Sequence, residues 1–507
     1  MFNLLHLKKY IPIFGLTFVL SFLFLPMLNH PFLSDDYIWV DRISTPNNFS
    51  LFFQQTFTLN QEHFLYRPIM PTSLRLCYQI AGITPFCMHL VSFVLHFLNT
   101  LLTWRLSYML TKSKWTAWGA AFFFSAYFPH VESVAWISDL GNPLATFFIL
   151  ITTILFLLFI RSKKLSFWLI SIGTFGFALI SKESSLALGP ILLIWGAIIY
   201  LWNVAGYHRK QILIACSSYT LAVIIFLLLV NRIGLNFALT GSGTYAFRFD
   251  IVTLSNVIYY SLNWIWPTDY SILQFIYQNL LDITRISTGS NIDTLSSIIA
   301  IPGIIWVVSG MLLIWLTVLW LYVKGKLLHR LAISWVILGT LPVIFLSGQS
   351  DRHFYVASVG LSLLFGYILF GNIKFFGNRV NTMWSGFKIL LFALLLILNI
   401  SWTQARLQNW KIAGEITRHV LESVKEDYPD LPSGAILLFV NLPIEYNGAH
   451  VFRLGLASAF KLELNRSDLE ANMLTNIDEL PTELASNQFA FLYKDGQLLD
   501  LTPNYRP

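Results

Sequence analysis

The sequence Phe32-Leu33-Ser34-Asp35-Asp36-Tyr37 directly follows the first long apolar segment of the chain, residues 10–29. A membrane-spanning helix needs about 20 mostly apolar residues, so this segment predicts a helix that crosses a membrane. Two adjacent carboxylates then lie where that helix reaches the membrane surface, where acidic residues are costly and commonly functional. Asp35 and Asp36 are therefore candidates for the acidic centre of an active site. The alternative is that they only mark where the first helix meets water, and this stretch alone leaves both interpretations open.

The composition predicts a polytopic membrane protein. Of the 507 residues, 56% are hydrophobic and 12% are charged, whereas a soluble domain is about 45–50% apolar and about 25% charged. The net charge of +7 is uneven: residues 403–507 hold 9 Lys and Arg and 14 Asp and Glu, a balance of −5, which leaves +12 for residues 1–402. Short loops on one side of the membrane account for this basic surplus, so it does not imply a nucleic acid partner.

Eleven apolar segments are candidate spans. They are residues 10–29, 86–110, 116–129, 136–160, 165–181, 185–203, 211–230, 296–323, 331–347, 355–371 and 386–402, with 116–129 running on toward Val134. Every second loop is basic if the N-terminus with Lys8 and Lys9 is cytoplasmic, which is the positive-inside pattern. An odd number of spans then places residues 403–507 outside. No small-x-small cleavage site follows residue 29, which argues against a cleaved signal peptide.

Three parts of the chain outside these spans have a recognisable pattern. Residues Ile69–Ile83 and Ile251–Trp266, within long outer segments, predict helices that lie on the membrane. Residues 403–507 predict a small extracytoplasmic α/β domain, with a helix at Gln404–Lys425 and strands at Ala435–Val440 and Phe489–Tyr493.

The three cysteines lack metal-ligand spacing. Cys77 and Cys87 could pair in an extracytoplasmic loop, although free buried thiols are favoured.

Five polar clusters fall at the outer ends of different spans, and the predicted topology places them on one face of the membrane. They are Asp35-Asp36; Tyr66-Arg67-Pro68; His130-Val131-Glu132, with Asp139 and Asn142 following; Ser181-Lys182-Glu183-Ser184; and Asp351-Arg352-His353. Such a mixture suits displacement of a phosphate leaving group, because carboxylates can deprotonate an acceptor hydroxyl. Arg67, Lys182, Arg352 and His353 could hold and neutralise the phosphate.

Blander interpretations of these residues remain open. Lys182 and Glu183 could form an ion pair with each other at a helix junction, and Arg352 could extend its side chain to the membrane interface. The stripe His89, Ser92, His96, Asn99 and Thr103 recurs at helical spacing. It is interpreted as contacts between helices, with a channel for lipid phosphate as the less favoured alternative. The sequence has no Walker loop, dinucleotide fingerprint or HExxH motif, so a soluble nucleotide donor is unsupported.

In this order, the clusters resemble motifs of the GT-C superfamily of membrane glycosyltransferases. The resemblance is greatest to the protein O-mannosyltransferase-like branch and its bacterial relatives, and it covers roughly residues 10–370. The matching stretches are Asp35-Asp36; Tyr66-Arg67-Pro68 with Pro85-Phe-Cys-Met-His89; Phe128-Pro-His130-Val-Glu132-Ser-Val-Ala-Trp136-Ile-Ser; Ser181-Lys182-Glu183; and Asp351-Arg352-His353-Phe-Tyr355. The chain departs from the family in lacking tetratricopeptide repeats, in having Asp351 where Glu is common, and in having His353 where an aromatic residue is usual.

The resemblance implies a GT-C fold of about 11 transmembrane helices over residues 1–402. It implies an inverting transfer from a polyprenyl-phosphate sugar to a hydroxyl of a protein or glycan at the outer membrane face. A bacterial inner membrane is expected because the chain is compact. The implied roles are one Asp of Asp35 and Asp36 as base, Glu132 ordering the site, Arg67, Lys182, Arg352 and His353 on the donor phosphate, and Tyr66, His130, Asp139 and Glu183 in support.

The same sequence features bear on a metal cofactor and on two other functions. An Asp-Asp pair could hold a divalent cation, but the resembling branch works without one, so no metal or other cofactor is expected. A transporter or lipid flippase would be favoured by inverted repeats and by helices broken in mid-membrane, and the sequence suggests neither. A polysaccharide polymerase or ligase, in which the acceptor is also lipid-linked, stays open.

Overall fold

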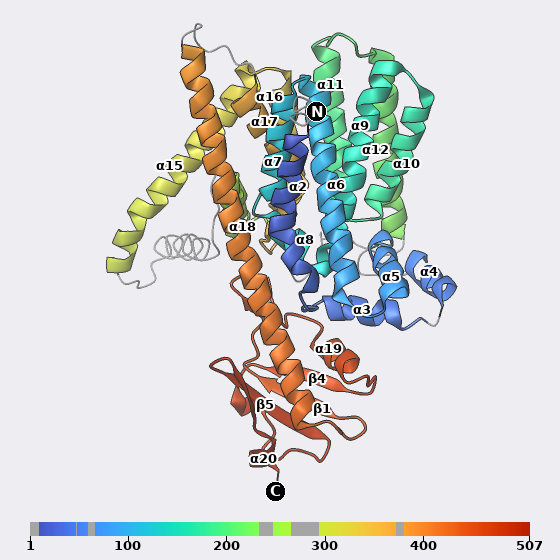
Figure 1. Cartoon of the computed structure of the whole chain (residues 1–507), viewed down its shortest axis with the longest axis vertical. Coiled ribbons are helices and arrows are strands. Elements are labelled where there is room, and N and C mark those ends of the chain that lie inside the picture. Colours follow the sequence, from blue (N-terminus) through green and yellow to red (C-terminus); the bar gives the residue numbers. More distant parts are fainter. Residues whose placement is uncertain are drawn as a thin grey trace, which may run out of the picture.

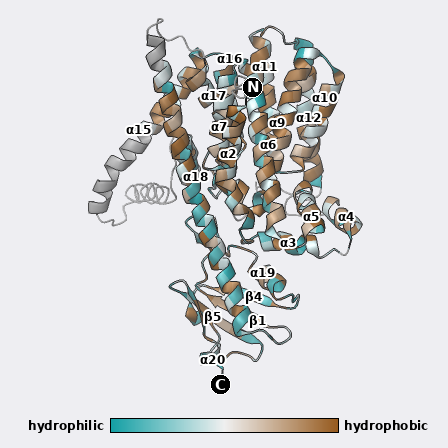
Figure 2. Cartoon of the chain, viewed as in Figure 1, coloured by the Kyte–Doolittle hydropathy of each residue, from teal (hydrophilic) through white to brown (hydrophobic). Residues whose placement is uncertain are grey.

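In the computed structural model, apolar helices stand side by side in a bundle, and a small α/β domain lies at one end of it (Figure 1). The structure describes residues 10–46, 48–58, 66–232, 247–264, 294–371 and 380–506. Large apolar side chains such as Phe18 on the first helix and Leu228 further along the chain are exposed on the outside of the bundle. This exposure is expected of helices surrounded by lipid, and Figure 2 shows the bundle as predominantly hydrophobic.

Each of the eleven predicted spans coincides with a helix. These helices are α2 (Ile11–Phe24, continued by η1, Leu25–Asn29), α6 (Pro85–Thr111), α7 (Lys114–Ala126), α9 (Gly141–Ser162, preceded by η2, Ile137–Asp139), α10 (Leu165–Leu179), α11 (Leu188–Leu201, preceded by η3, Glu183–Ala187), α12 (Arg209–Arg232), α15 (Thr294–Lys324), α16 (Leu327–Thr340), α17 (Ala357–Phe370) and α18 (Val380–Asp427). Within the described residues, six helices are long and apolar enough to cross a membrane, and four more are apolar but shorter. The number of spans therefore stays a prediction.

The third predicted span differs from the structure. It was expected to run on toward Val134, but α7 ends at Ala126 and a separate short helix, α8 (His130–Ala135), follows. Pro129 lies between them, and a proline disfavours helical conformation in the residue before it. The break matters for the site, because Glu132 lies on the separate helix α8.

Short helices and one 3₁₀ turn lie outside these spans. The first outer segment contains α3 (Asp36–Ser44), α4 (Phe49–Phe57) and α5 (Ile69–Ala81), and α13 (Ile251–Asn263) belongs to the second. Both predicted helices outside the spans are therefore present where the chain is described; residues 265 and 266 of the second lie outside the described residues. η4 (Asp351–Phe354) precedes α17. Cys77 and Cys87 are free thiols whose Sγ atoms lie 2.6 Å apart.

The C-terminal part is built on α18, which runs without interruption for 48 residues. The predicted domain boundary at 402/403 falls inside this helix, because no proline occurs between residues 380 and 427. A four-stranded sheet follows, in the order β4 (Glu470–Leu474), β1 (Ile436–Val440), β5 (Gln488–Lys494), β6 (Gln497–Asp500). β4, β1 and β5 are parallel, and β6 returns antiparallel to β5.

Smaller elements complete the C-terminal domain: the hairpin β2 (Glu445–Tyr446) and β3 (Ala449–His450), the helices α19 (Leu456–Glu463) and α20 (Thr502–Tyr505), and the turn η5 (Ile477–Glu479). The predicted fold class, a polytopic helical membrane protein with a small C-terminal α/β domain, is confirmed.

Candidate active site

The five polar clusters meet at the end of the bundle that faces the C-terminal domain, and side-chain contacts connect them into one network. Asp36 is fully buried, and its Oδ1 accepts hydrogen bonds from the N–H of Ser138, at 2.7 Å, and from the Ser138 hydroxyl. Its Oδ2 accepts from the Leu33 N–H at 3.1 Å. Burial raises the pKa of Asp36 to about 7. Asp35 is half-buried, and its Oδ1 accepts from the Ser34 hydroxyl at 3.0 Å.

The second and third connections are ion pairs between clusters. Arg67 contacts both oxygens of Glu183, with Nε 2.7 Å from Oε2. The adjacent Lys182 forms its ion pair with Asp139. Asp139 also accepts from the Ser133 hydroxyl at 2.6 Å. An ion pair between Lys182 and Glu183 was one of the open interpretations, and it is not the arrangement found, since each of the two binds a partner from another cluster.

The fourth connection joins Glu132 on α8 to η4. Glu132 accepts from the Ser350 hydroxyl at 2.6 Å and from the Arg352 N–H at 3.0 Å, and the Arg352 guanidinium lies 3.4 Å from it. Burial alone would raise the pKa of Glu132, but Arg352, together with His450 and Ser350, lowers it well below its usual range. Arg352 is only 5% exposed and lies 5.0 Å over the ring of Trp136, so its side chain does not extend to the surface.

Two further residues of η4 face the second outer segment. Asp351 forms an ion pair with Arg406 of α18 and accepts from the Tyr259 hydroxyl of α13. His353 Nδ1 lies 3.0 Å from the Tyr260 hydroxyl. Burial, with help from the positive charge of Arg352, lowers the pKa of His353 to about 3. A neutral His353 can hydrogen-bond a ligand near pH 7 but cannot neutralise its charge.

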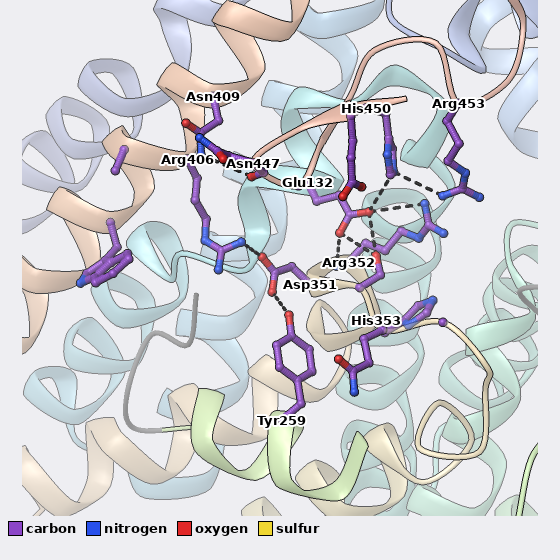
Figure 3. A pocket seen from close by; sticks show the side chains of 17 residues that line it. Glu132, Tyr259, Asp351, Arg352, His353, Arg406, Asn409, Asn447, His450 and Arg453 are labelled. Atoms are coloured by element: carbon purple, nitrogen blue, oxygen red, sulfur yellow. Dashed lines mark hydrogen bonds and ion pairs between the residues drawn. The ribbon is translucent and has the colours of Figure 1, made fainter. Parts of the chain in front are cut away.

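A cavity of about 250 Å³ opens beside this network, between η4, α18 and the hairpin of the C-terminal domain (Figure 3). Of the predicted site residues, Glu132, Arg352 and His353 line it. The others lie elsewhere in the network or outside it. Tyr66 donates to the Phe57 carbonyl at 3.2 Å. His130 is buried at 2.7 Å from the Ser358 hydroxyl, where it joins α8 to α17.

The C-terminal domain contributes residues that the sequence did not identify. His450 of β3 packs against Trp136, with ring centroids 4.5 Å apart, and its Nε2 lies 3.8 Å from Glu132. Arg406 and Arg453 also line the cavity. The available signal was the polar segment around the turn at Tyr446-Asn447-Gly448, which was assigned to a separate domain.

The same segment of the C-terminal domain holds the loop that carries the acidic pair. The Ser34 N–H donates to the Val451 carbonyl at 3.0 Å, and the Leu454 N–H donates to the Ser34 hydroxyl at 3.2 Å. Ser34 has a φ of +47° and therefore depends on such support. The acidic pair and the C-terminal domain are thus joined directly.

Two other features concern the polar stripe of α6 and the possibility of a metal site. In the polar stripe of α6, His96 Nδ1 lies 2.8 Å from the Tyr355 hydroxyl, and Asn99 donates to the Pro143 carbonyl at 2.9 Å. These contacts fit the interpretation that the stripe joins helices. Over the described ranges, no three His, Cys, Asp or Glu side chains gather in a way that could hold a metal ion.

No protein-family model and no curated protein matches the sequence. Among solved structures, the chain is similar to the Archaeoglobus fulgidus oligosaccharyltransferase in complex with Zn and sulfate, with 12% identity and a TM-score of 0.48, over 93% of this chain and 63% of that one. It is also similar to the archaeal oligosaccharyltransferase AglB from Archaeoglobus fulgidus in complex with an inhibitory peptide and a dolichol-phosphate, with 12% identity, a TM-score of 0.49, and 92% and 65% of the two chains covered. The chain thus spans 63–65% of the length of these structures. At this level the likeness concerns the course of the chain and assigns neither family nor activity.

Proposed function

We propose that the chain is a GT-C-type glycosyltransferase that moves a sugar from a polyprenyl-phosphate donor to a hydroxyl acceptor, with inversion at the anomeric carbon. The observation that carries the proposal is the connected network of five clusters, which the sequence separates by up to 317 residues between Asp35 and Arg352. Carboxylates and guanidinium groups buried together at one end of apolar helices are expensive to maintain. They suit a reaction that removes a proton on one side and stabilises a leaving phosphate on the other.

Within this proposal, Asp35 is the better candidate for the base. A base must come within hydrogen-bond reach of the acceptor proton. Asp35 is half-buried, whereas Asp36 is fully buried and both its oxygens already accept hydrogen bonds from Leu33 and Ser138. Asp36 then holds its own loop in place through the hydrogen bonds that it accepts from Ser138.

The cationic residues are assigned to the donor. Arg67, Lys182 and Arg352 each face one carboxylate of the network, so a lipid phosphate would bind by sharing these partners. His353 would donate or accept a hydrogen bond as a neutral ring. The proposed setting is the outer face of a bacterial inner membrane, with the N-terminus cytoplasmic, and the lipid donor enters from the bilayer. No metal is assigned a role, and the acceptor is a protein or a glycan.

The proposal is tested by sugar transfer in proteoliposomes supplied with a panel of polyprenyl-phosphate sugars. The wild type is compared with Asp35→Asn, Asp36→Asn and, as the matched control on the same outer helix, Asp41→Asn. Asp35→Asn should lower donor turnover about 10²–10⁴-fold, the usual contribution of a general base, with insertion and folding intact. Turnover that is unchanged in both pair variants would remove the acidic pair from the mechanism. A parallel arm with a chelator should leave turnover unchanged.

A further inference from the structure

The cavity beside the network has a wall made by three parts of the chain. The loop before η4 contributes Gln349 and Ser350, α18 contributes Trp402 and Asn409, and the hairpin β2–β3 contributes Asn447 at its turn. Figure 3 shows Asn409 and Asn447 beside this space, with Glu132 between the hairpin and η4. A cavity at such a junction, next to buried charged groups, is a candidate ligand site.

The charges of this wall balance. They are the three guanidinium groups of Arg352, Arg406 and Arg453 and the three carboxylates of Glu132, Asp351 and Glu445. Arg352 forms an ion pair with Glu132, and Arg406 forms one with Asp351. These groups give the wall no net charge, so the choice of ligand rests on its uncharged polar groups.

The remaining polar groups of the wall are the imidazoles of His353 and His450, amides and hydroxyls. Gln349, Asn409 and Asn447 each carry an amide, which offers two donors and an acceptor. The Asn409 amide already lies 3.4 Å from the Asn447 carbonyl and the Gln349 amide 2.9 Å from Ser255. The aromatic rings of Trp402 and Tyr259 complete the wall. Amides that match neighbouring hydroxyls, combined with aromatic rings that pack on C–H groups, are the chemistry that recognises a sugar.

The size of the cavity agrees with this ligand. Its volume of about 250 Å³ is slightly below the about 300–1,000 Å³ of pockets that hold drug-sized molecules. A cavity of this volume suits one or two sugar rings.

We propose that this cavity is the acceptor subsite, bordered by the donor phosphate at Arg352 and His353, and that the acceptor is an uncharged saccharide. The inference rests on the proposed function. In the reaction, an acceptor hydroxyl loses its proton to the carboxylate base, and its oxygen forms the new bond to the anomeric carbon. The bond from that carbon to the phosphate oxygen breaks, and the polyprenyl phosphate leaves with both electrons. The segment Val451–Gly455 includes Arg453 of the cavity wall and also contacts Ser34, the residue before Asp35, so it borders both the cavity and the acidic pair.

The test measures binding without turnover. Methyl glycosides of glucose, galactose and mannose are titrated against the full chain in lipid nanodiscs, free of glycoside detergents, and binding is followed by saturation-transfer NMR. Asn447→Gly removes the amide without backbone strain, because Asn447 has a φ of +45°. Asn465→Gly is the matched control, since Asn465 has a φ of +52° in the same domain and does not line the cavity.

At least one glycoside should bind, and Asn447→Gly should weaken its binding about fivefold or more, as expected for a lost hydrogen bond, while Asn465→Gly should not. Equal binding by both variants would overturn the inference. So would binding, dependent on Asn447, of inorganic phosphate or of a serine-containing peptide while no glycoside binds. The result is separable from the proposed function. If Asp35→Asn abolishes donor turnover but glycosides ignore Asn447, the subsite fails and the transferase stands. If glycoside binding depends on Asn447 but no donor is consumed, the acceptor role fails.

Discussion

Gly455 allows the contact between the C-terminal domain and the acidic pair to be tested with one methyl group. A Cβ at this position would collide with the Ser34 carbonyl oxygen, with the Ser34 carbonyl carbon 3.1 Å away. Gly455 also has a φ of +82°, and an alanine in left-handed conformation costs about 1–2 kcal/mol. The collision adds about 1–3 kcal/mol of overpacking, so Gly455→Ala should lower the free energy of unfolding by about 2–5 kcal/mol in total.

The matched control is Gly434→Ala in the same domain. Gly434 has a φ of +67°, and a Cβ there would meet nothing within 4 Å, so this variant carries the backbone strain without the collision. Because misplacement of a reacting group by about 1 Å can cost about a hundredfold in rate, kcat of Gly455→Ala should fall about 10–100-fold. Gly434→Ala should stay within about twofold.

The two variants are compared by transfer in proteoliposomes and by thermal unfolding in nanodiscs. The pH dependence of kcat serves as the readout that lost stability would not move, because displacing Ser34 should change the surroundings of Asp35. Wild-type kcat and pH dependence in folded Gly455→Ala would refute the reasoning. Equal losses in both variants would attribute the effect to backbone strain alone.

Three further predictions concern buried charge. Since burial raises the pKa of Asp36 to about 7, the folded chain holds this proton more tightly than the unfolded chain. The free energy of unfolding should therefore fall by up to about 4 kcal/mol as pH rises from about 4 to 7, and thermal unfolding of Asp36→Asn should lack this slope. Asp139→Leu should cost about 3–5 kcal/mol by leaving Lys182 buried without its carboxylate; in a double-mutant cycle with Lys182→Met, the double variant should regain most of that stability, but not transfer. Arg406→Met should destabilise the chain by about 3 kcal/mol because it removes the cation beside Asp351, and Arg406→Lys should recover part of the loss on the same thermal assay.

Each of these has a clear contrary result. A pH-independent wild type would show that Asp36 is solvated. Additive effects of the Asp139 and Lys182 substitutions would deny that the two residues interact. Identical melting temperatures of Arg406→Met and wild type would mean that the ion pair between Arg406 of α18 and Asp351 of η4 does not stabilise the chain.

The positions of the five clusters could be predicted because charge is rare in this chain. Where 56% of residues are hydrophobic, each run of polar residues at the end of an apolar segment stands out, and alternation of basic loops assigns it to one side. Two strands of the C-terminal domain, β1 and β5, were equally accessible, since Ile436–Val440, for example, is a short apolar run between turn residues; the other four strands were not predicted.

The partners within the network could not be predicted in the same way. Lys182 and Glu183 are adjacent, but the backbone at Lys182 is extended, with φ −163° and ψ 144°. Successive side chains of an extended backbone point to opposite sides, so Lys182 contacts Asp139 while Glu183 contacts Arg67. No local pattern in the sequence encodes that choice.

The contribution of residues 403–507 was also beyond local pattern. The change in charge at residue 403 was interpreted as the start of a separate domain. Whether such a domain folds back on the bundle depends on contacts such as Ser34 with Val451, which are more than 400 residues apart. Arg406 and His450 were missed for this reason.

The continuity of α18 has a mechanical consequence. At about 1.5 Å per residue, its 48 residues make a rod about 72 Å long, of which the first half is apolar and the second half hydrophilic (Figure 2). Each residue added to an α-helix turns everything beyond it by about 100° around the axis. One residue inserted near the middle of α18 would swing the sheet and its hairpin to another side of the rod, whereas a length change in an ordinary linker would be absorbed. The number of residues in this helix is therefore itself a determinant of the site.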